Sequence, residues 1–290
     1  MRALLLALVI ALLPSTSNAL EVFACEPEWG SLVNELAGDR ANVTVATTAF
    51  QDPHRLQAKP SLIAAIRGAD LVVCTGADLE IGWLPLLLRR GGNATVFMAA
   101  DHVRKLEIPK VLDRTQGDIH PQGNPHVHLD PRNIRRVANA LTEQLVELVP
   151  AQTEEFRSRL EDFQQRWSEA MLQWEEKAAG LVGLEFVSHH RSFSYLANWL
   201  DIEIVATLES KPGIPPSGAQ LASLLEQLSE NPPLGVIRTP YENEKPSLWL
   251  MERLSVPAIM LPYTIGGNAA VVDLFTLFEN TLRILEGYKR

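Results

Sequence analysis

The feature that most constrains the fold is an alternation of short apolar runs with helix-like stretches, which occurs in two separate parts of the chain. The apolar runs lie at residues 22–25, 43–46 and 71–76, and again at residues 184–187, 202–206, 234–237 and 258–261. Strands that alternate with helices favour parallel sheets with helices on both faces. The alternation therefore predicts an α/β fold with two Rossmann-like lobes built on parallel sheets.

Between these two parts, the apolar residues change to helical spacing. They form one stripe of Phe156, Leu160, Phe163, Trp167, Met171, Trp174, Ala178 and Leu181. A helix of about 28 residues would be about 42 Å long, which is enough to run along both lobes. We expect a long rigid connecting helix, and an ordinary long surface helix within one domain would show the same stripe. Shorter helices are expected at 29–36 and 61–67, from Asn133, after Pro215-Pro216-Ser217, and over 270–285.

The N-terminus has the pattern of a secretory signal. Arg2 precedes the apolar run 3–13, and the small residues Ser17 and Ala19 suit a signal peptidase. No apolar run reaches the roughly 20 residues that cross a bilayer. Without Arg2 the formal charge moves from −9 to −10, which argues against nucleic acid or an anionic membrane as a partner. We expect a soluble periplasmic protein with a signal peptide at 1–19, an N-terminal α/β lobe at 20–150, the connecting helix at 151–180 and a C-terminal α/β lobe at 181–290.

Three histidine-bearing loops predict a metal site. They are Gln51-Asp52-Pro53-His54, Asn124-Pro125-His126-Val127-His128-Leu129-Asp130-Pro131 and Ser188-His189-His190-Arg191-Ser192-Phe193. Neutral imidazole is the commonest protein metal ligand, and three imidazoles suit zinc better than calcium or magnesium. Because ligands bind at the carboxyl ends of parallel strands, we expect the metal in the cleft between the lobes.

Not every histidine in these loops is expected to face the metal. His126 and His128 alternate on a segment that we expect to be extended, so only one of them points to the site, and the same holds for His189 and His190. Asp130 is a candidate to hold a ring nitrogen or to cap the following helix. His120, in the polar loop 116–123, is a candidate for metal capture. Carboxylates that could complete the site are Glu209, Glu242, Glu244 and Asp273.

The two cysteines end two of the apolar runs. If the runs of Cys25 and Cys74 are neighbours in one sheet, an oxidising compartment would let the thiols pair. Two inert buried thiols also fit the sequence.

The chain resembles the solute-binding proteins of metal-uptake ABC importers, a group that contains zinc- and manganese-binding periplasmic receptors. The resemblance runs from about residue 21 to 290, in the right order. It is carried by Asp52-Pro53-His54 with Lys59-Pro60-Ser61, Ala69-Asp70-Leu71-Val72-Val73, Gly76-Ala77-Asp78-Leu79-Glu80 with Trp83, the segment 124–131, and His190-Arg191-Ser192-Phe193-Ser194-Tyr195.

This resemblance implies that His54, His126 and His190 are the ligands and that His128, at a position usually held by an aromatic residue, is a neighbour of the site. It also implies two lobes with modest closure on binding. The chain departs from the family's usual carboxylates at Ile237-Arg238-Thr239-Pro240 and at 261–268. The fourth ligand therefore stays open, with Asp273 as the best substitute and Glu209 or water as alternatives.

The leading functional hypothesis is a monomeric periplasmic receptor that captures Zn2+ and delivers it to an inner-membrane ABC permease, without enzymatic turnover. Three imidazoles favour zinc over Mn2+. A periplasmic zinc chaperone is a further candidate partner. The alternatives are an exported metallohydrolase, because His126-Val127-His128-Leu129-Asp130 fits a His-x-His-x-Asp pattern, and a metal-dependent adhesin or zinc buffer.

Overall fold

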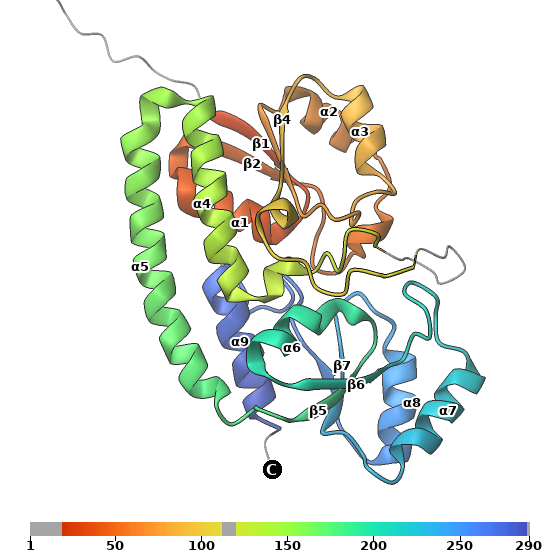
Figure 1. Cartoon of the computed structure of the whole chain (residues 1–290). Coiled ribbons are helices and arrows are strands. Elements are labelled where there is room, and N and C mark those ends of the chain that lie inside the picture. Colours follow the sequence, from red (N-terminus) through yellow and green to blue (C-terminus); the bar gives the residue numbers. More distant parts are fainter. Residues whose placement is uncertain (1–18, 112–119, 289–290) are drawn as a thin grey trace, which may run out of the picture.

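The structure, a computed structural model, describes residues 19–111 and 120–288. The predicted signal peptide therefore lies outside the described residues, apart from Ala19. The described residues form two sheets of four parallel strands, and helices cover both sheets (Figure 1). The prediction of an α/β fold with two parallel-sheet lobes is confirmed.

The N-terminal sheet has the strand order β2-β1-β3-β4. Its elements are β1 Leu20–Ala24, α1 Pro27–Ala37, β2 Ala41–Val45, α2 Pro60–Gly68, β3 Leu71–Cys74, α3 Leu84–Arg90, β4 Thr95–Met98 and α4 Pro131–Leu148. In this lobe, the sequence pattern did not predict β4 and α3. β4 is an edge strand with only Phe97 buried, although the apolar run Val96-Phe97-Met98 lies in it.

The C-terminal sheet has the order β6-β5-β7-β8. Its elements are β5 Glu185–Ser188, α6 Ser194–Leu200, β6 Glu203–Thr207, α7 Gly218–Leu228, β7 Gly235–Arg238, α8 Glu244–Leu254, β8 Ala258–Met260 and α9 Leu274–Glu286. In both lobes, the strand that the chain forms first lies in the interior of the sheet and pairs with the two strands that follow it.

Proline and capping residues fix several helix starts. Pro27, Pro60 and Pro131 lie in the first turns of α1, α2 and α4, where a missing backbone N–H costs nothing. The start predicted at Asn133 is corrected to Pro131, because the Asp130 side chain accepts a hydrogen bond from the Arg132 N–H.

The start predicted at Ala270 is likewise corrected to Leu274. Asp273 and Thr276 form a capping box, in which each side chain bonds the backbone N–H of the other residue. Such a box fixes the first turn of α9 and ends the preceding loop.

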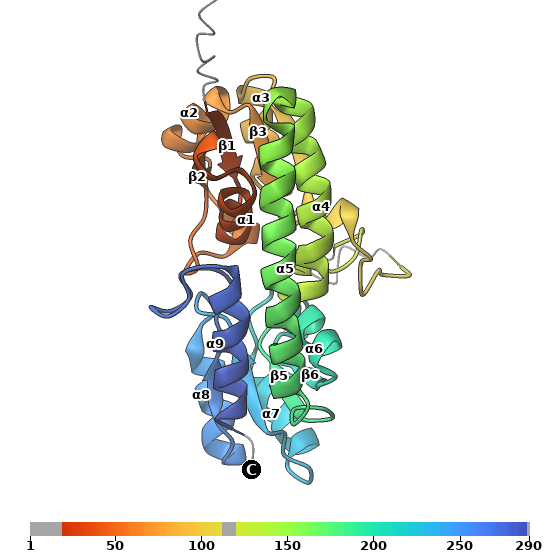
Figure 2. The ribbon, with the colours of Figure 1, turned by 90° about the vertical axis from the view of Figure 1, so that its left-hand side faces the viewer.

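The helix α5 Thr153–Ala178 has 26 residues and runs along both lobes (Figure 2). It packs against α1 and α4 on one lobe and against α9 on the other. Trp167 contacts Phe275 and Phe278 of α9, with ring centroids 4.8 and 5.6 Å apart. One hydrophobic core continues from the N-terminal sheet through α5 to the C-terminal sheet. The domain boundaries at 150 and 180 stay a prediction.

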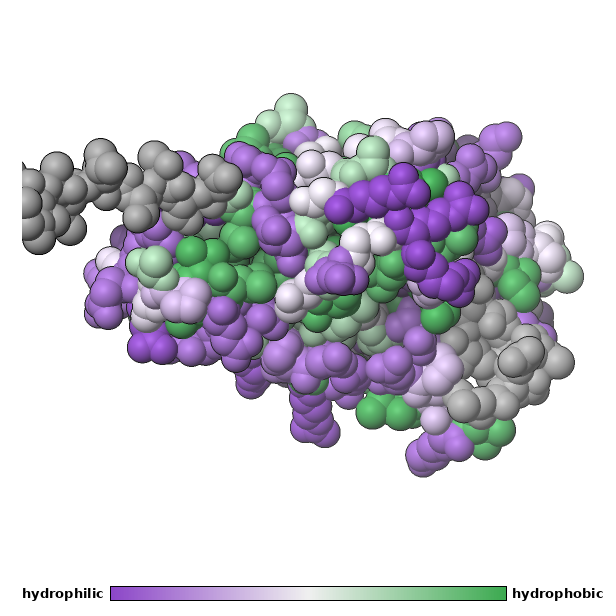
Figure 3. All heavy atoms as spheres, turned by 90° about the horizontal axis from the view of Figure 1, so that it is seen from above, coloured by the Kyte–Doolittle hydropathy of each residue, from purple (hydrophilic) through white to green (hydrophobic). Residues whose placement is uncertain are grey.

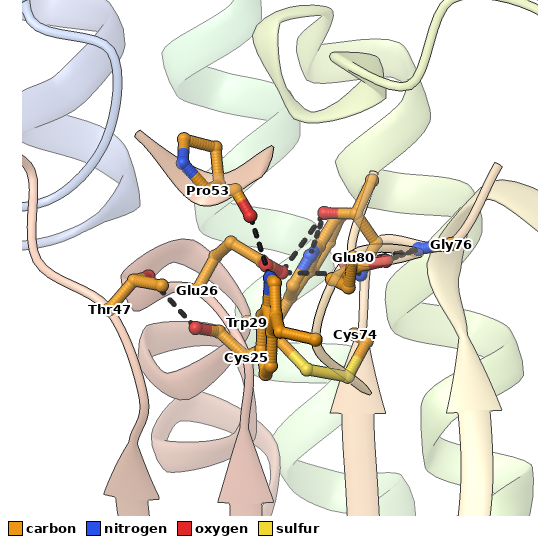
Figure 4. The surroundings of a disulfide bond; sticks show 10 residues. Cys25, Glu26, Trp29, Thr47, Pro53, Cys74, Gly76 and Glu80 are labelled. Atoms are coloured by element: carbon orange, nitrogen blue, oxygen red, sulfur yellow. Dashed lines mark hydrogen bonds between the residues drawn. A yellow bond between two sulfur atoms is a disulfide. The ribbon is translucent and has the colours of Figure 1, made fainter. Parts of the chain in front are cut away.

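Cys25 and Cys74 form a disulfide between neighbouring strands of the N-terminal sheet (Figure 4). β1 pairs with β3 up to Ala24 and Val73, so the next residues on both strands lie side by side, with Cα atoms 4.8 Å apart. Of the two alternatives that the sequence left open, the structure shows the paired thiols.

In the described part of the chain, every helix is too short or too polar to cross a bilayer. The face seen from the N-terminal lobe is largely hydrophilic and carries separate apolar areas (Figure 3).

Replacing both cysteines tests the contribution of the disulfide to stability. The bridge joins residues 49 apart in sequence, so loop-closure entropy predicts that Cys25→Ala with Cys74→Ala lowers the free energy of unfolding by about 4 kcal/mol. Urea unfolding of the variant and of oxidised wild type measures the difference. Wild type unfolded in the presence of a reductant is the control, and its free energy of unfolding should approach that of the variant. A difference below about 1 kcal/mol would contradict this expectation.

Candidate metal centre

The carboxyl ends of both sheets point to the region between the lobes, and the loops that leave these strands supply its polar side chains. Glu26 follows β1, His54 follows β2, Thr75 follows β3, His190 follows β5, Glu209 follows β6, Glu242 follows β7 and Tyr263 follows β8. Loops at the carboxyl ends of parallel strands are the usual ligand-binding region of α/β folds.

Three imidazoles from both lobes meet in this region. One ring nitrogen each from His54, His126 and His190 lies within 4.8 Å of the other two. The ring centroids are 5.5 to 5.8 Å apart. His126 is fully buried and His190 is 9% exposed. The fold thus brings together the three histidines that the sequence singled out, and it spreads them over two lobes.

Each of these rings has a partner at Nδ1. His54 Nδ1 lies 2.8 Å from Asp52 Oδ1, and His190 Nδ1 lies 2.8 Å from Glu209 Oε2. A carboxylate only accepts hydrogen bonds, so both Nδ1 atoms donate and both Nε2 atoms keep a lone pair. This arrangement, in which an outer group fixes the tautomer, is typical of metal-binding histidines.

The third ring has a neutral partner. His126 Nδ1 lies 2.7 Å from the Tyr263 hydroxyl, and His126 Nε2 is buried without a hydrogen-bond partner among the described residues. A buried nitrogen without a partner is costly unless it binds a ligand. The donor set therefore fits a cation among the three Nε2 atoms.

The electrostatics keep His126 neutral. Burial, followed by the neighbouring imidazoles His54 and His190, holds the pKa of His126 well below its usual range. Because a metal ligand must be deprotonated, an imidazole that is already neutral binds without releasing a proton.

His120 lies at the same cluster. Its Nε2 is 3.2 Å from His54 Nε2, and the two ring centroids are 5.2 Å apart. Burial lowers the pKa of His120 to about 3. Residues 112–119, which include part of the polar loop predicted to capture metal, lie outside the described residues.

The prediction of Asp273 as the fourth ligand is corrected. The Asp273 carboxylate caps α9 and lines a separate surface hollow with Glu35 and Arg166. Its alternative, Glu209, does lie at the cluster, but Glu209 Oε2 already accepts from His190 Nδ1 and from the Gly213 N–H.

The remaining candidates have other surroundings. The segment of His128 forms the 3-10 turn Val127–Leu129, so the expected extended backbone was wrong. His128 Nε2 lies 2.8 Å from the Tyr263 carbonyl oxygen and its Nδ1 lies 3.2 Å from Glu28 Oε1. Asp130 caps α4. The His-x-His-x-Asp residues therefore do not converge, which removes the basis of the metallohydrolase hypothesis.

The other carboxylates and His189 lie around the cluster. His189 is buried, with Nε2 3.9 Å from Glu209 Oε1. Glu242 is half-buried near His190, its Oε2 accepts from the Thr239 N–H and its Oε1 has no hydrogen-bond partner among the described residues, and burial raises its pKa to about 7. Glu244 lies in the first turn of α8, where it pairs with Arg238 at 3.3 Å.

Two residues without a role in the sequence analysis hold the ligands. Asp52 could have been recognised, since an aspartate before Pro-His can accept from the backbone two residues on, as it does from the His54 N–H. Tyr263 gives no such signal, because it reaches His126 across 137 positions of sequence.

Buried carboxylates support the loop after β3, beside the disulfide (Figure 4). Glu80 accepts from the Thr75 and Gly76 N–H groups, and Glu26 accepts from Thr75. Burial, followed by the charge of Glu80, holds the pKa of Glu26 well above its usual range. Burial raises the pKa of Glu80 to about 7. The two carboxyl groups therefore share a proton near neutral pH.

A cleft of about 650 Å3 leads to the histidines. It is lined by His120, His126, His190 and Glu209 among others. A small ion can reach the cluster from this side.

A family model described as "Zinc-uptake complex component A periplasmic" matches residues 22–286. The "Zinc-binding lipoprotein AdcA" of Streptococcus pneumoniae strain R6 is 27% identical over 210 residues, which are 68% of this chain and 40% of that protein. The "High-affinity zinc uptake system protein ZnuA" of Bacillus subtilis strain 168 is 25% identical over 68% of this chain and 63% of its own length. The chain thus spans less than two thirds of these relatives.

Solved structures share the fold. A crystal structure of ZnuA has a TM-score of 0.79 at 21% identity and covers 93% of this chain and 98% of its own. A Mn-bound periplasmic metal-binding protein from Candidatus Liberibacter asiaticus has a TM-score of 0.78 at 14% identity, with 93% and 99% covered.

The shared proton of Glu26 and Glu80 predicts a pH dependence of stability. Because the pKa of Glu80 rises from 4.5 to about 7 on folding, the folded chain holds a proton that the unfolded chain releases, and this contribution is lost as the pH rises from about 4.5 to 7. Glu80→Gln keeps one oxygen that can accept from the Thr75 and Gly76 N–H groups, and it cannot ionise. Between pH 5 and pH 8, the free energy of unfolding of this variant should therefore rise by up to about 3 kcal/mol relative to that of wild type.

Urea unfolding of metal-free protein at both pH values measures this gain. Glu161→Gln, on the exposed face of α5, is the control and should keep the wild-type pH dependence. A Glu80→Gln variant with the same pH dependence as wild type would show that the pair carries no extra proton.

Proposed function

We propose that this chain, which belongs to the family of the periplasmic zinc-uptake complex component A, is a periplasmic receptor that captures Zn2+ between its lobes and delivers it to an ABC importer in the inner membrane. The observation that carries the proposal is the convergence of His54, His126 and His190, each with a partner at Nδ1. We propose these three histidines as the metal ligands.

The ligand chemistry supports zinc as the cargo. Imidazole nitrogen suits zinc, whereas manganese usually takes more carboxylate oxygen. The carboxylates of Asp52 and Glu209 are engaged with ring Nδ1 atoms, so they orient nitrogen ligands. Relatives of this chain include proteins named for zinc and proteins named for manganese. The nitrogen-rich donor set favours zinc.

The two-lobed fold supports capture without turnover. The ligands lie in a cleft between lobes, where a small relative displacement of the lobes would change their spacing, and the metal itself is what such a protein carries. The partners in this proposal are zinc, an inner-membrane permease and a periplasmic zinc chaperone, and the protein acts as a monomer. Its periplasmic location rests on the signal sequence predicted at 1–19.

Loss of one ligand histidine tests the proposal. His190→Ala should lower the affinity for Zn2+ by at least about 100-fold, since removing a group that only orients a ligand already costs 10- to 100-fold. Competition with a chromophoric zinc chelator measures the affinity. His102→Ala is the matched control, because the exposed His102 ring stacks on Phe97 away from the cluster. Equal affinities of His190→Ala and wild type would refute the proposed site.

The carboxylate behind His190 provides a second test. Glu209→Gln keeps the size of the side chain but removes the charge that stabilises the Nδ1 proton, so zinc affinity should fall about 10- to 100-fold. Glu244→Gln, on the exposed first turn of α8, is the control and should bind as wild type does. The same competition assay applies, and an unchanged affinity of Glu209→Gln would show that Glu209 does not tune the site.

A further inference from the structure

The three histidines leave one position of a tetrahedral zinc ion open, and the carboxylates nearby already accept hydrogen bonds from other groups. Structural zinc sites have four ligands, and transport sites need enough ligands to retain the ion. Asp273 caps α9, and Glu209 is engaged with His190 and Gly213. His120, which lines the same cleft, offers a further nitrogen ligand.

We propose that His120 is this fourth ligand, so that four imidazoles surround the zinc ion. This inference rests on the function proposed above and adds a ligand that departs from the carboxylate expected from the sequence. Two nitrogen ligands at 2.0–2.1 Å from a tetrahedral zinc lie about 3.3–3.4 Å apart. The distance of 3.2 Å between His120 Nε2 and His54 Nε2 is close to this value.

The ring nitrogens of His54 and His120 support the proposal. Asp52 accepts from His54 Nδ1, so His54 Nε2 carries a lone pair. His120 Nε2 faces His54 Nε2, which leaves His120 Nδ1 on the far side of the ring. A cation between the two Nε2 atoms would bind both rings through their lone pairs.

Ala77 is a neighbour of this ring. It lies in the loop after β3 that Glu80 supports through the Thr75 and Gly76 N–H groups, and it has a positive φ of 49°. The loop beside His120 is therefore fixed by buried structure. His54, His126 and His190 each have a hydrogen-bond partner at Nδ1, and His120 Nε2 faces His54 Nε2.

His120 lies nearer to His54 than to the rest of the cluster. Its ring centroid is 5.2 Å from that of His54 and 6.5 Å from that of His126. Completing a tetrahedron requires the His120 ring to move towards His126 when the metal binds. His120 also lines the 650 Å3 cleft that leads to the cluster, so it lies on the side from which an ion can enter.

X-ray absorption of zinc-loaded wild type tests the coordination directly. Four imidazole ligands are expected in wild type and three in His120→Ala. A count of three in wild type, with water or a carboxylate as the fourth ligand, would overturn the proposal. This measurement on wild type does not depend on the folding of any variant.

Affinity separates this inference from the proposed function. Chelator competition should show a loss of at least about tenfold for His120→Ala and no loss for His102→Ala. Wild-type affinity in His120→Ala, together with a large loss in His190→Ala, would refute the fourth ligand and leave the zinc receptor standing. Wild-type protein without zinc affinity would refute the receptor itself. Visible absorption of the Co2+ form should also change its tetrahedral bands in His120→Ala and keep them in His102→Ala.

Discussion

The packing of α5 against α9 holds together the two lobes that supply the proposed metal ligands. Trp167 and Trp174 of α5 contact Phe278 of α9, and the same core continues into the N-terminal sheet. This aromatic contact joins α5, which runs along both lobes, to α9 of the C-terminal lobe (Figure 2). The loops with His54 and His126 come from one lobe and the loop with His190 comes from the other. Without this packing, the three imidazoles would have no common centre.

The site uses its charged groups for orientation. Asp52 and Glu209 accept from ring Nδ1 atoms, and Tyr263 takes the corresponding place at His126. Carboxylates in this position raise the basicity of the imidazole and fix its tautomer. A site built in this way presents nitrogen atoms to the ion, and the carboxylates of Asp52 and Glu209 contact the imidazole rings instead of the ion. This distribution favours a borderline-soft ion such as zinc over a hard ion that needs direct oxygen contacts.

Local sequence signals predicted most of the fold and the three histidines, and contacts between distant segments account for the rest. The apolar runs predicted seven of the eight described strands, and the stripe predicted α5, because burial imposes a period. β4 was missed although it contains the apolar run Val96-Phe97-Met98. Asp273 was expected at the metal because it follows Gly266-Gly267 in a loop of the second lobe, yet its capping box with Thr276 directs it elsewhere. The role of Tyr263 depends on how the lobes meet, which no local pattern encodes.

The division of ligands between the lobes bears on how such a site would release its ion. On the assignment proposed above, His54, His120 and His126 belong to the N-terminal lobe, and His190 alone belongs to the C-terminal lobe. A small displacement of the lobes would then remove one ligand and leave three, which is the coordination of zinc sites that exchange their fourth ligand. Because the core through α5 is continuous, only small displacements are compatible with the fold. A small displacement of the lobes can remove a single imidazole from the ion. A stiff two-lobed protein can therefore still release a tightly bound ion.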